Sequence, residues 1–217
     1  MIKLTRSGIV VSGSAQDLER MCGEFELKHC ILLPTFLEPR LLQFIHRQLD
    51  EAKFDQTIYE GIGADLCMTR NIPLGLLYLL INDPMLFQVI QQLTGCGRIG
   101  CFTGRVYRMV SGSGHYDWHD DVSEDRMVAL SINLSKEIYS GGILQIREWE
   151  WQRIIQEAAN VGFGDGILFR LADSLEHRVT DVEGRVPKTA FAGWFRSQPD
   201  FLSMVKSRPP AQQYKIE

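Results

Sequence analysis

The sequence of 217 residues lacks the features of several common classes of protein. Asp and Glu (27) outnumber Lys and Arg (23), giving a net charge of -4, so the basic excess that nucleic acid backbones select is missing. No apolar run approaches the roughly 18 residues of a membrane-spanning helix, and the N-terminus shows no apolar signal-peptide segment. We therefore expect neither a nucleic acid nor a membrane as partner.

Cysteine is scarce and follows no metal-binding or disulfide pattern. The five thiols form no Cys-x-x-Cys pair and are odd in number, which is typical of reduced, mostly buried cysteines. They are Cys22, Cys30, Cys67, Cys96 and Cys101. Together with the missing signal peptide, this pattern predicts a cytoplasmic protein. A hydrophobic content of 45% and a charged content of 23% are ordinary values for one folded domain.

The first 95 residues predict mainly helices. Apolar residues recur at helical spacing, and Ser14 and Asp83 are suited to cap helices. Helices are expected over residues 14–21, 38–54, 74–80 and 84–93. Strands are expected over residues 2–12, as one strand or a hairpin, and over residues 30–34. Residues 55–72 lack periodicity and predict a loop.

Short strands bounded by Gly, Asp or Pro follow residue 95. They are expected over residues 98–109, 115–121, 127–134, 142–147, 166–170 and 188–196. Such spacing indicates a sandwich or barrel, and helices that precede strands indicate an α+β domain with a helical brace. We expect one domain over 1–217, with helical support over about 1–95, a strand-rich core over about 96–200 and a loose tail over about 201–217.

Histidine is scarce too, and three of the five lie where they could share a metal. Residues 114–121, Gly-His-Tyr-Asp-Trp-His-Asp-Asp, hold two successive His-x-Asp pairs, and His177 follows downstream. Residues two apart in a strand project from one face and can bind one ion. Two imidazoles and one carboxylate leave positions open on ferrous iron, although zinc would also accept them. The spacing alone leaves open which pair binds the metal.

The surroundings of this motif narrow the choice. Tyr116 stands three residues before the second His, Gly141 and Gly142 follow about twenty residues on, and Lys188 lies eleven residues past His177. Over roughly residues 95–197 the chain thereby resembles the iron(II)- and 2-oxoglutarate-dependent dioxygenases, most closely the prolyl 4-hydroxylase and prolyl hydroxylase-domain branch. The family pattern is Gly-x-Tyr-(Asp/Glu)-x-His-x-Asp, then Gly-Gly, a distal His, and Lys or Arg.

The resemblance implies a double-stranded β-helix (jelly-roll, cupin-like) core braced by N-terminal helices. It assigns Fe(II) to the catalytic ligands His119, Asp121 and His177. It assigns 2-oxoglutarate to Lys188, with Arg185 as a competing anchor, and to Tyr107, Asn133 and Tyr116 as further candidates. Rim or substrate positions are His115, Asp117, Arg147 and Arg185. Asn133 could instead lie at a sheet edge and Arg147 on a solvated strand, and Trp194 is expected in the core.

The implied reaction is hydroxylation of an unactivated C–H bond, with O2 and 2-oxoglutarate consumed and succinate and CO2 released. A prolyl residue of a protein or peptide is the first candidate substrate, and a free amino acid or natural product is the alternative. The family also suggests ascorbate as a cofactor. A catalytically silent cupin-like metal-binding or sensing module and a zinc enzyme remain alternatives. Residues 55–70 and 148–158 are candidate lids, because loops often carry substrate choice.

Overall fold

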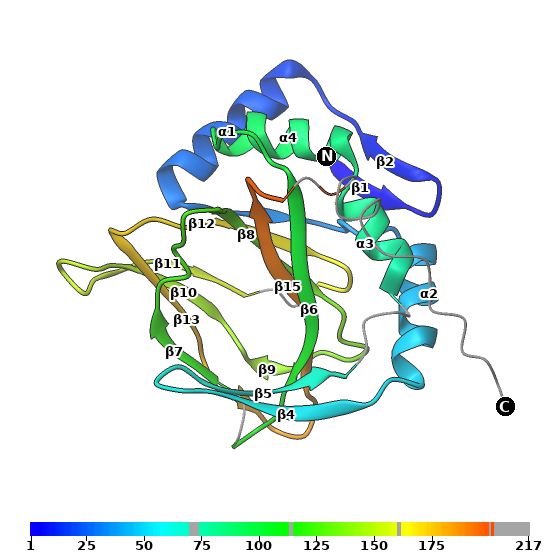
Figure 1. Ribbon diagram of the computed structural model, residues 1–217, viewed down its shortest axis with the longest axis vertical. Coiled ribbons are helices and arrows are strands. Elements are labelled where there is room, and N and C mark those ends of the chain that lie inside the picture. The colour runs from blue at the N-terminus through cyan, green and yellow to red at the C-terminus, as the bar shows by residue number, and fades with distance from the viewer. Residues whose placement is uncertain (70–73, 113–114, 160–161, 200, 202–217) are drawn as a thin grey trace, which may run out of the picture.

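The computed structural model describes residues 1–69, 74–112, 115–159, 162–199 and 201. Figure 1 shows a body of strands, wrapped around on itself, with helices along one side. The helices are α1 (Ala15–Lys28), α2 (Pro39–Asp50), α3 (Gly75–Ile81) and α4 (Pro84–Thr94). No helix in this described part of the chain is both long enough and apolar enough to cross a membrane.

The strands of the N-terminal half are β1 (Ile2–Thr5), β2 (Gly8–Val11), β3 (Cys30–Leu33), β4 (Phe54–Tyr59) and β5 (Gly63–Met68). Those of the C-terminal half are β6 (Cys101–Met109), β7 (His115–His119), β8 (Arg126–Asn133), β9 (Ser140–Gly141), β10 (Leu144–Glu148), β11 (Ile154–Ala158), β12 (Gly166–Arg170), β13 (Leu175–Val179), β14 (Val182–Glu183) and β15 (Lys188–Arg196).

An antiparallel sheet contains most of these strands. Its order is β11-β10-β13-β7-β5-β6-β15-β8-β12-β3, and β4 pairs with β5. The sheet curls into a nearly closed barrel-like jelly roll, in which β6, β15, β8 and β12 form one wall and β10, β13 and β7 the opposite one (Figure 1). The predicted α+β jelly-roll fold is confirmed.

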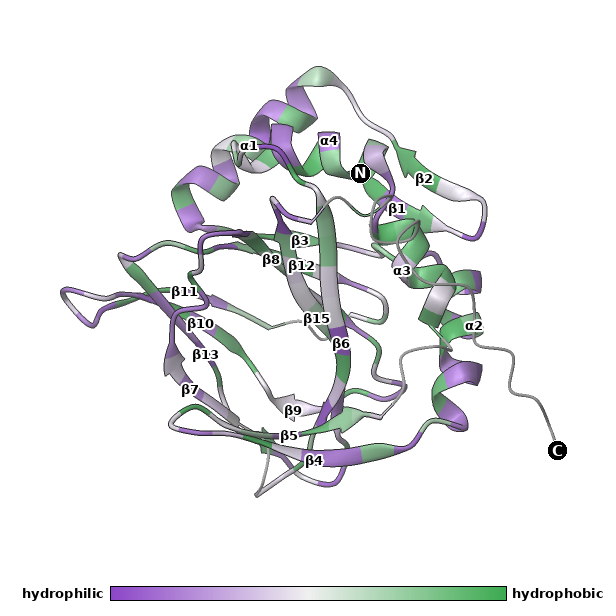
Figure 2. Cartoon of the chain, viewed as in Figure 1, coloured by the Kyte–Doolittle hydropathy of each residue, from purple (hydrophilic) through white to green (hydrophobic). Residues whose placement is uncertain are grey.

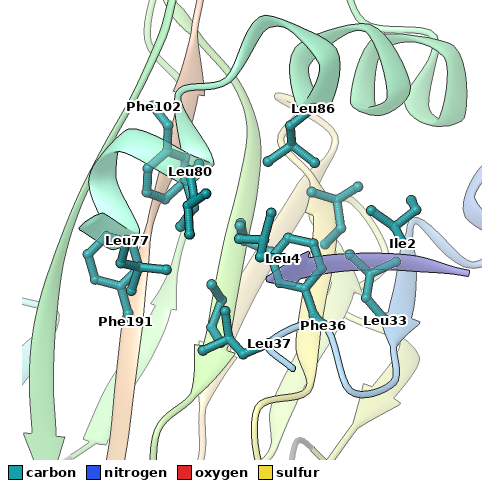
Figure 3. Packing of buried hydrophobic residues seen from close by; sticks show 14 of the residues in the cluster. Ile2, Leu4, Leu33, Phe36, Leu37, Leu77, Leu80, Leu86, Phe102 and Phe191 are labelled. Carbon is teal, nitrogen blue, oxygen red and sulfur yellow. The ribbon is translucent and has the colours of Figure 1, made fainter. Parts of the chain in front are cut away.

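Side chains along the wall made by β6, β15 and β8 point alternately outward, toward the helices, and inward, toward the interior of the jelly roll. Phe102, Phe191 and Phe195 point outward and join the largest apolar cluster with residues of α3 and α4. Figure 3 shows Phe102 and Phe191 beside Leu77 and Leu80 of α3. Figure 2 shows that α3 and α4 are largely hydrophobic, as helices packed against a sheet must be.

Local signals account for the ends of the helices. Ser14 accepts a hydrogen bond from the backbone N–H of Asp17, and Asp17 bonds back to Ser14 in a capping box. Asp83 caps α4, whose first residue is Pro84, as predicted. Helix α1 runs to Lys28, well beyond the expected end at Met21, because the chain reaches a left-handed residue only at His29, with φ 58°.

The loop predicted over residues 55–72 is wrong for most of its length. Strands β4 and β5 form a hairpin there, and β5 pairs with both β6 and β7. The hairpin is half-exposed, so its apolar residues do not alternate strictly. Its strands form because they pair with neighbouring strands, and no apolar stripe in the sequence marks them. Residues 70–73 lie outside the described residues. Residues 154–158, within the second predicted lid, also form a strand, β11, at the edge of the sheet.

The expected tail over 201–217 lies outside the described residues except for residue 201. The expected helical support over residues 1–95 also supplies strands to the main sheet: β3 pairs with β12, and β5 links β6 to β7. The N-terminal half is therefore part of the jelly roll as well as its brace.

Candidate metal centre

The two candidate histidine ligands lie on neighbouring strands. His119 ends β7, His177 lies in β13, and the antiparallel register pairs them directly. Their ring centroids are 4.4 Å apart. Asp121 follows two residues after the end of β7, with its Oδ2 atom 3.3 Å from His177 Nε2 and 4.0 Å from His119 Nε2. One potential ligand atom from each residue lies within 4.8 Å of the others.

A β-bulge in β7 shapes this arrangement. The register pairs His177 with His119 but Val179 with Tyr116, so β7 has one more residue than β13 over this stretch. Tyr116 and His119 therefore both line the cavity, although they are three residues apart. Asp117 is exposed. The regular alternation expected from the sequence, which would place Asp117 on the same face as His119, does not hold.

Hydrogen bonds orient the candidate ligands. His119 Nδ1 lies 2.6 Å from the backbone carbonyl of Asp117, which directs Nε2 toward Asp121. The carboxylate of Asp121 accepts a hydrogen bond from Trp194 Nε1 at 3.0 Å and one from Arg126 Nη1 at 3.0 Å. Such outer contacts fix the direction of metal ligands in proteins.

The charge states suit a divalent cation. Burial, reinforced by the neighbouring His177, lowers the pKa of His119, which favours the neutral imidazole that a metal requires. Burial acts against the charge of Asp121, but hydrogen bonding to His177 and the charges of both histidines hold its pKa below the usual value. Two imidazoles and one ionised carboxylate thus fit Fe(II), and by ligand type they also fit zinc.

A cavity of about 460 Å³ opens next to the three residues. The triad lines it together with Lys188, which is 3% exposed and reaches in from β15. Lys188 Nζ donates a hydrogen bond to the carbonyl of Gly142 at 2.6 Å, and burial lowers the pKa of this lysine to about 8. Arg185 is exposed and lies outside the cavity lining, so the geometry favours Lys188 as the anchor.

The Gly141-Gly142 pair has a steric reason to be there. Gly141 has φ 71°, and a Cβ atom on it would lie 2.0 Å from the carbonyl oxygen of Asp181. Gly142 has φ 61°, and its Cβ atom would lie 2.9 Å from Lys188 Cδ. The left-handed conformation and the missing side chains leave room for the buried lysine.

Two of the further cosubstrate candidates line the cavity, and one does not. Tyr107 is buried in the lining and hydrogen-bonds with Ser131, and burial raises its pKa to about 12, so that it stays a phenol. Tyr116 also lines the cavity. The side chain of Asn133 donates to the carbonyl of Gly162 and accepts from the backbone of Ser135, and it is not among the lining residues.

Of the remaining rim candidates, Arg147 is not among the residues that line the cavity. Arg147 pairs with Glu176 at 2.7 Å and lies 4.2 Å from the ring centroid of Trp118, so it belongs to a bonded outer surface. The backbone of His115 pairs with Ala64, and its side chain lies outside the described part of the structure.

Sequence reasoning missed several residues of the cavity. Trp194, expected in the core, lines it and bonds Asp121. Counting in steps of two from Lys188 along β15 would have found Trp194, and the same step back from Tyr107 would have found Arg105. Asp65, which does not line the cavity but accepts a hydrogen bond from Tyr116 in its wall, lies in the segment predicted as a loop, where no strand periodicity marked it.

Comparisons with known proteins bear on the class of enzyme. Residues 104–196 match the family model described as the 2OG-Fe(II) oxygenase superfamily. No curated protein matches the chain. Over residues 104–196 the chain is therefore similar to the 2OG-Fe(II) oxygenases, and the class of enzyme that the sequence predicts, an oxygenase, is confirmed.

Solved structures share the fold at low identity. A prolyl-4-hydroxylase from Pseudomonas putida has a TM-score of 0.61 and 18% identity, over 84% of this chain and 100% of that one. A prolyl hydroxylase from Trichoplax adhaerens, in complex with a hypoxia inducible factor peptide, has a TM-score of 0.64 and 14% identity, over 91% and 99%. The α-ketoglutarate-dependent epimerase SnoN, from nogalamycin biosynthesis, has a TM-score of 0.63 and 12% identity, over 91% and 92%.

Proposed function

We propose that this protein is an Fe(II)- and 2-oxoglutarate-dependent hydroxylase with His119, Asp121 and His177 as its iron ligands. The observation that carries the proposal is that one cavity is lined both by this triad and by the buried Lys188. The triad provides three ligands to a metal, and the ammonium group of Lys188 provides a charge partner for the distal carboxylate of 2-oxoglutarate.

Each residue has a separate task in the proposed reaction. Iron, when bound, supplies the activation of O2 that protein side chains cannot perform. Lys188 holds the cosubstrate by charge and hydrogen bonding, and Tyr107 offers a phenol hydroxyl in the same cavity. Trp194 and Arg126 keep the carboxylate of Asp121 in place. The apolar side chains of Leu144, Ile167, Phe169 and Val179 limit water in the cavity.

The substrate of first choice is a prolyl residue in a protein or peptide, hydroxylated with succinate and CO2 as coproducts. The similar folds of two prolyl hydroxylases support this choice. The epimerase SnoN shares the fold equally well, and a fold does not select a substrate. A free amino acid or a natural product is therefore kept as the alternative. Ascorbate is an added component to test, and a cytoplasmic location remains our expectation.

The test is turnover of 2-oxoglutarate without added substrate. We expect purified protein to form succinate slowly, with Fe(II) required and zinc inactive. His119→Ala and Asp121→Ala are expected to abolish both iron binding and turnover, whereas His115→Ala should retain them. The opposite pattern would mean that the other His-x-Asp pair binds the metal. Iron binding without any succinate would favour the silent module or the zinc enzyme.

A further inference from the structure

Among the described residues, three lysine or arginine side chains line the cavity, and two of them already have a task. Lys188 is assigned to 2-oxoglutarate under the proposed function. Arg126 lies 3.0 Å from the carboxylate of Asp121 and 3.8 Å from the ring centroid of Trp194, so it holds a proposed metal ligand. Arg105 is the third. Its guanidinium has no part in the proposed metal or cosubstrate sites.

Arg105 is fixed in place but incompletely bonded. It lies on β6 opposite Ala192 of β15, with its guanidinium 4.8 Å from the ring centroid of Tyr59. Its Nη2 atom is 3.4 Å from Tyr116 Oη and 3.7 Å from Asp65 Oδ2. Its Nε atom is buried and has no hydrogen-bond partner within the described part of the chain. Buried donors are normally paired, so an unpaired one at a cavity wall calls for an explanation.

The nearby carboxylate does not fully satisfy this arginine. Strong guanidinium–carboxylate bonds are about 2.7–2.9 Å long, and the contact with Asp65 is longer, at 3.7 Å. Asp65 also accepts hydrogen bonds from the hydroxyl of Tyr116 and from the thiol of Cys67. Its charge is thus shared among several donors, and Arg105 keeps capacity for another anion.

The position of Arg105 is close to the proposed chemistry. Its Nη2 atom contacts the phenol of Tyr116, and the Tyr116 ring centroid is 6.2 Å from that of His119. An anion bound by Arg105 would therefore hold its adjacent carbon atoms beside the metal ligands.

We propose that Arg105 binds a carboxylate of the primary substrate. This inference rests on the proposed function and names the substrate class: a free amino acid or other carboxylic acid, or an acidic side chain next to the modified residue of a peptide. A planar carboxylate matches the fork of donors on arginine. A phosphate, with its second negative charge, would be repelled by Asp65 beside the same guanidinium.

The test compares carboxylates with their amides. The full chain, loaded with zinc, which is redox-inert, and with 2-oxoglutarate, is titrated by calorimetry with the standard free amino acids, the carboxylic acids from acetate to octanoate, and the amide of each. Capped Pro-Glu and Pro-Gln peptides form the second arm, and phosphoserine is added as a phosphate probe. We expect at least one carboxylate to bind roughly ten- to one hundredfold more tightly than its amide.

Three variants test whether the preference for a carboxylate over its amide depends on Arg105. Arg105→Gln should abolish it, whereas Arg20→Gln, which removes an arginine whose side chain is 68% exposed on α1, should leave it unchanged. Arg105→Lys, which keeps the charge but not the fork, should retain part of it and covers the case in which Arg105→Gln fails to fold.

The inference is overturned if no carboxylate binds, if the phosphate probe alone binds, or if the preference for a carboxylate survives in Arg105→Gln. If Arg105→Gln instead weakens only 2-oxoglutarate binding, Arg105 belongs to the cosubstrate site and the inference fails. Iron-dependent succinate formation without added substrate, measured on the same preparations, is independent of this question. Its presence in the unaltered protein would uphold the proposed function even if the substrate assignment failed.

Discussion

The two faces of strand β15 have opposite character. Phe191 and Phe195 on the outer face are fully buried against the helical layer. Lys188, Ala192 and Trp194 on the inner face line the cavity. The outer face of β15 thus supplies apolar packing, and its inner face supplies side chains that line the cavity. The alternation of a strand lets nine consecutive residues serve stability and chemistry separately.

The largest effect should come from the inner face. Lys188→Met is expected to weaken 2-oxoglutarate binding by roughly one hundred- to one thousandfold, because it removes the partner of a buried charge. The unfolding free energy without ligand should not fall, since a buried ammonium bonded to one carbonyl is replaced by an apolar side chain. Calorimetry and urea unfolding measure the two quantities. Normal affinity in Lys188→Met, with lost affinity in Arg185→Gln, would transfer the anchor to Arg185.

The outer face should show the reverse. Phe191→Ala is expected to lower the unfolding free energy by about 3–5 kcal/mol, the usual cost of truncating a buried phenylalanine, while the folded protein keeps its affinity for 2-oxoglutarate. Urea unfolding monitored by circular dichroism gives the first value. Phe163→Ala, at a residue 44% exposed, is the control and should cost far less. A large loss of cosubstrate affinity in Phe191→Ala would show that the two faces are not independent.

A smaller effect, expected from a glycine beside Lys188, tests the same contrast between stability and cosubstrate binding. Gly142→Ala and Gly184→Ala both force a side chain into positive φ, at 61° and 75°, which costs about 1–2 kcal/mol. Only the first would also push against Lys188, because no atom lies within 4 Å of a Cβ at Gly184. We expect Gly142→Ala alone to weaken 2-oxoglutarate binding, on the order of tenfold. Equal affinities in the two variants would contradict the steric role of Gly142.

The inner face of β15 should also show a pH dependence. Burial lowers the pKa of Lys188 to about 8 in the folded protein, against 10.5 ordinarily. Above pH 8 the side chain of Lys188 is mostly the neutral amine, which must gain a proton before it can bind 2-oxoglutarate. The affinity for 2-oxoglutarate should therefore fall by about tenfold per pH unit.

The stability of the ligand-free protein should change in the other direction. Between pH 8 and 10.5 the unfolded chain binds more protons at this lysine than the folded one, so the contribution of Lys188 to stability rises with pH. Calorimetry and urea unfolding from pH 7 to 10 test both trends. Lys188→Met should lack them, and a trend that persists in that variant would belong to another group.

The sequence predicted the inner face of β15 better than the strands around it. Strand β15 was expected with the bounds the structure has, and the proposed ligands were chosen by their register with Tyr116 and the glycine pair. The bulge in β7 could not be foreseen, because it depends on pairing with β13. The hairpin of β4 and β5 was missed for a related reason: its half-exposed residues form strands through their neighbours, not through an apolar pattern.

Strand β3 has a consequence for how the chain acquires its structure. It pairs with β12, and the backbone of Thr35, just after it, bonds Asp165 across 130 residues. During synthesis β3 leaves the ribosome long before its partner exists, and closure over such a separation is slow. A nascent chain halted before β12 would expose Ile31 and Leu33 along an unpaired edge, which is a template for aggregation. The segment exposed in this way lies far in the sequence from the proposed metal ligands, near the N-terminus, although in the folded protein it pairs with a strand that lines the cavity.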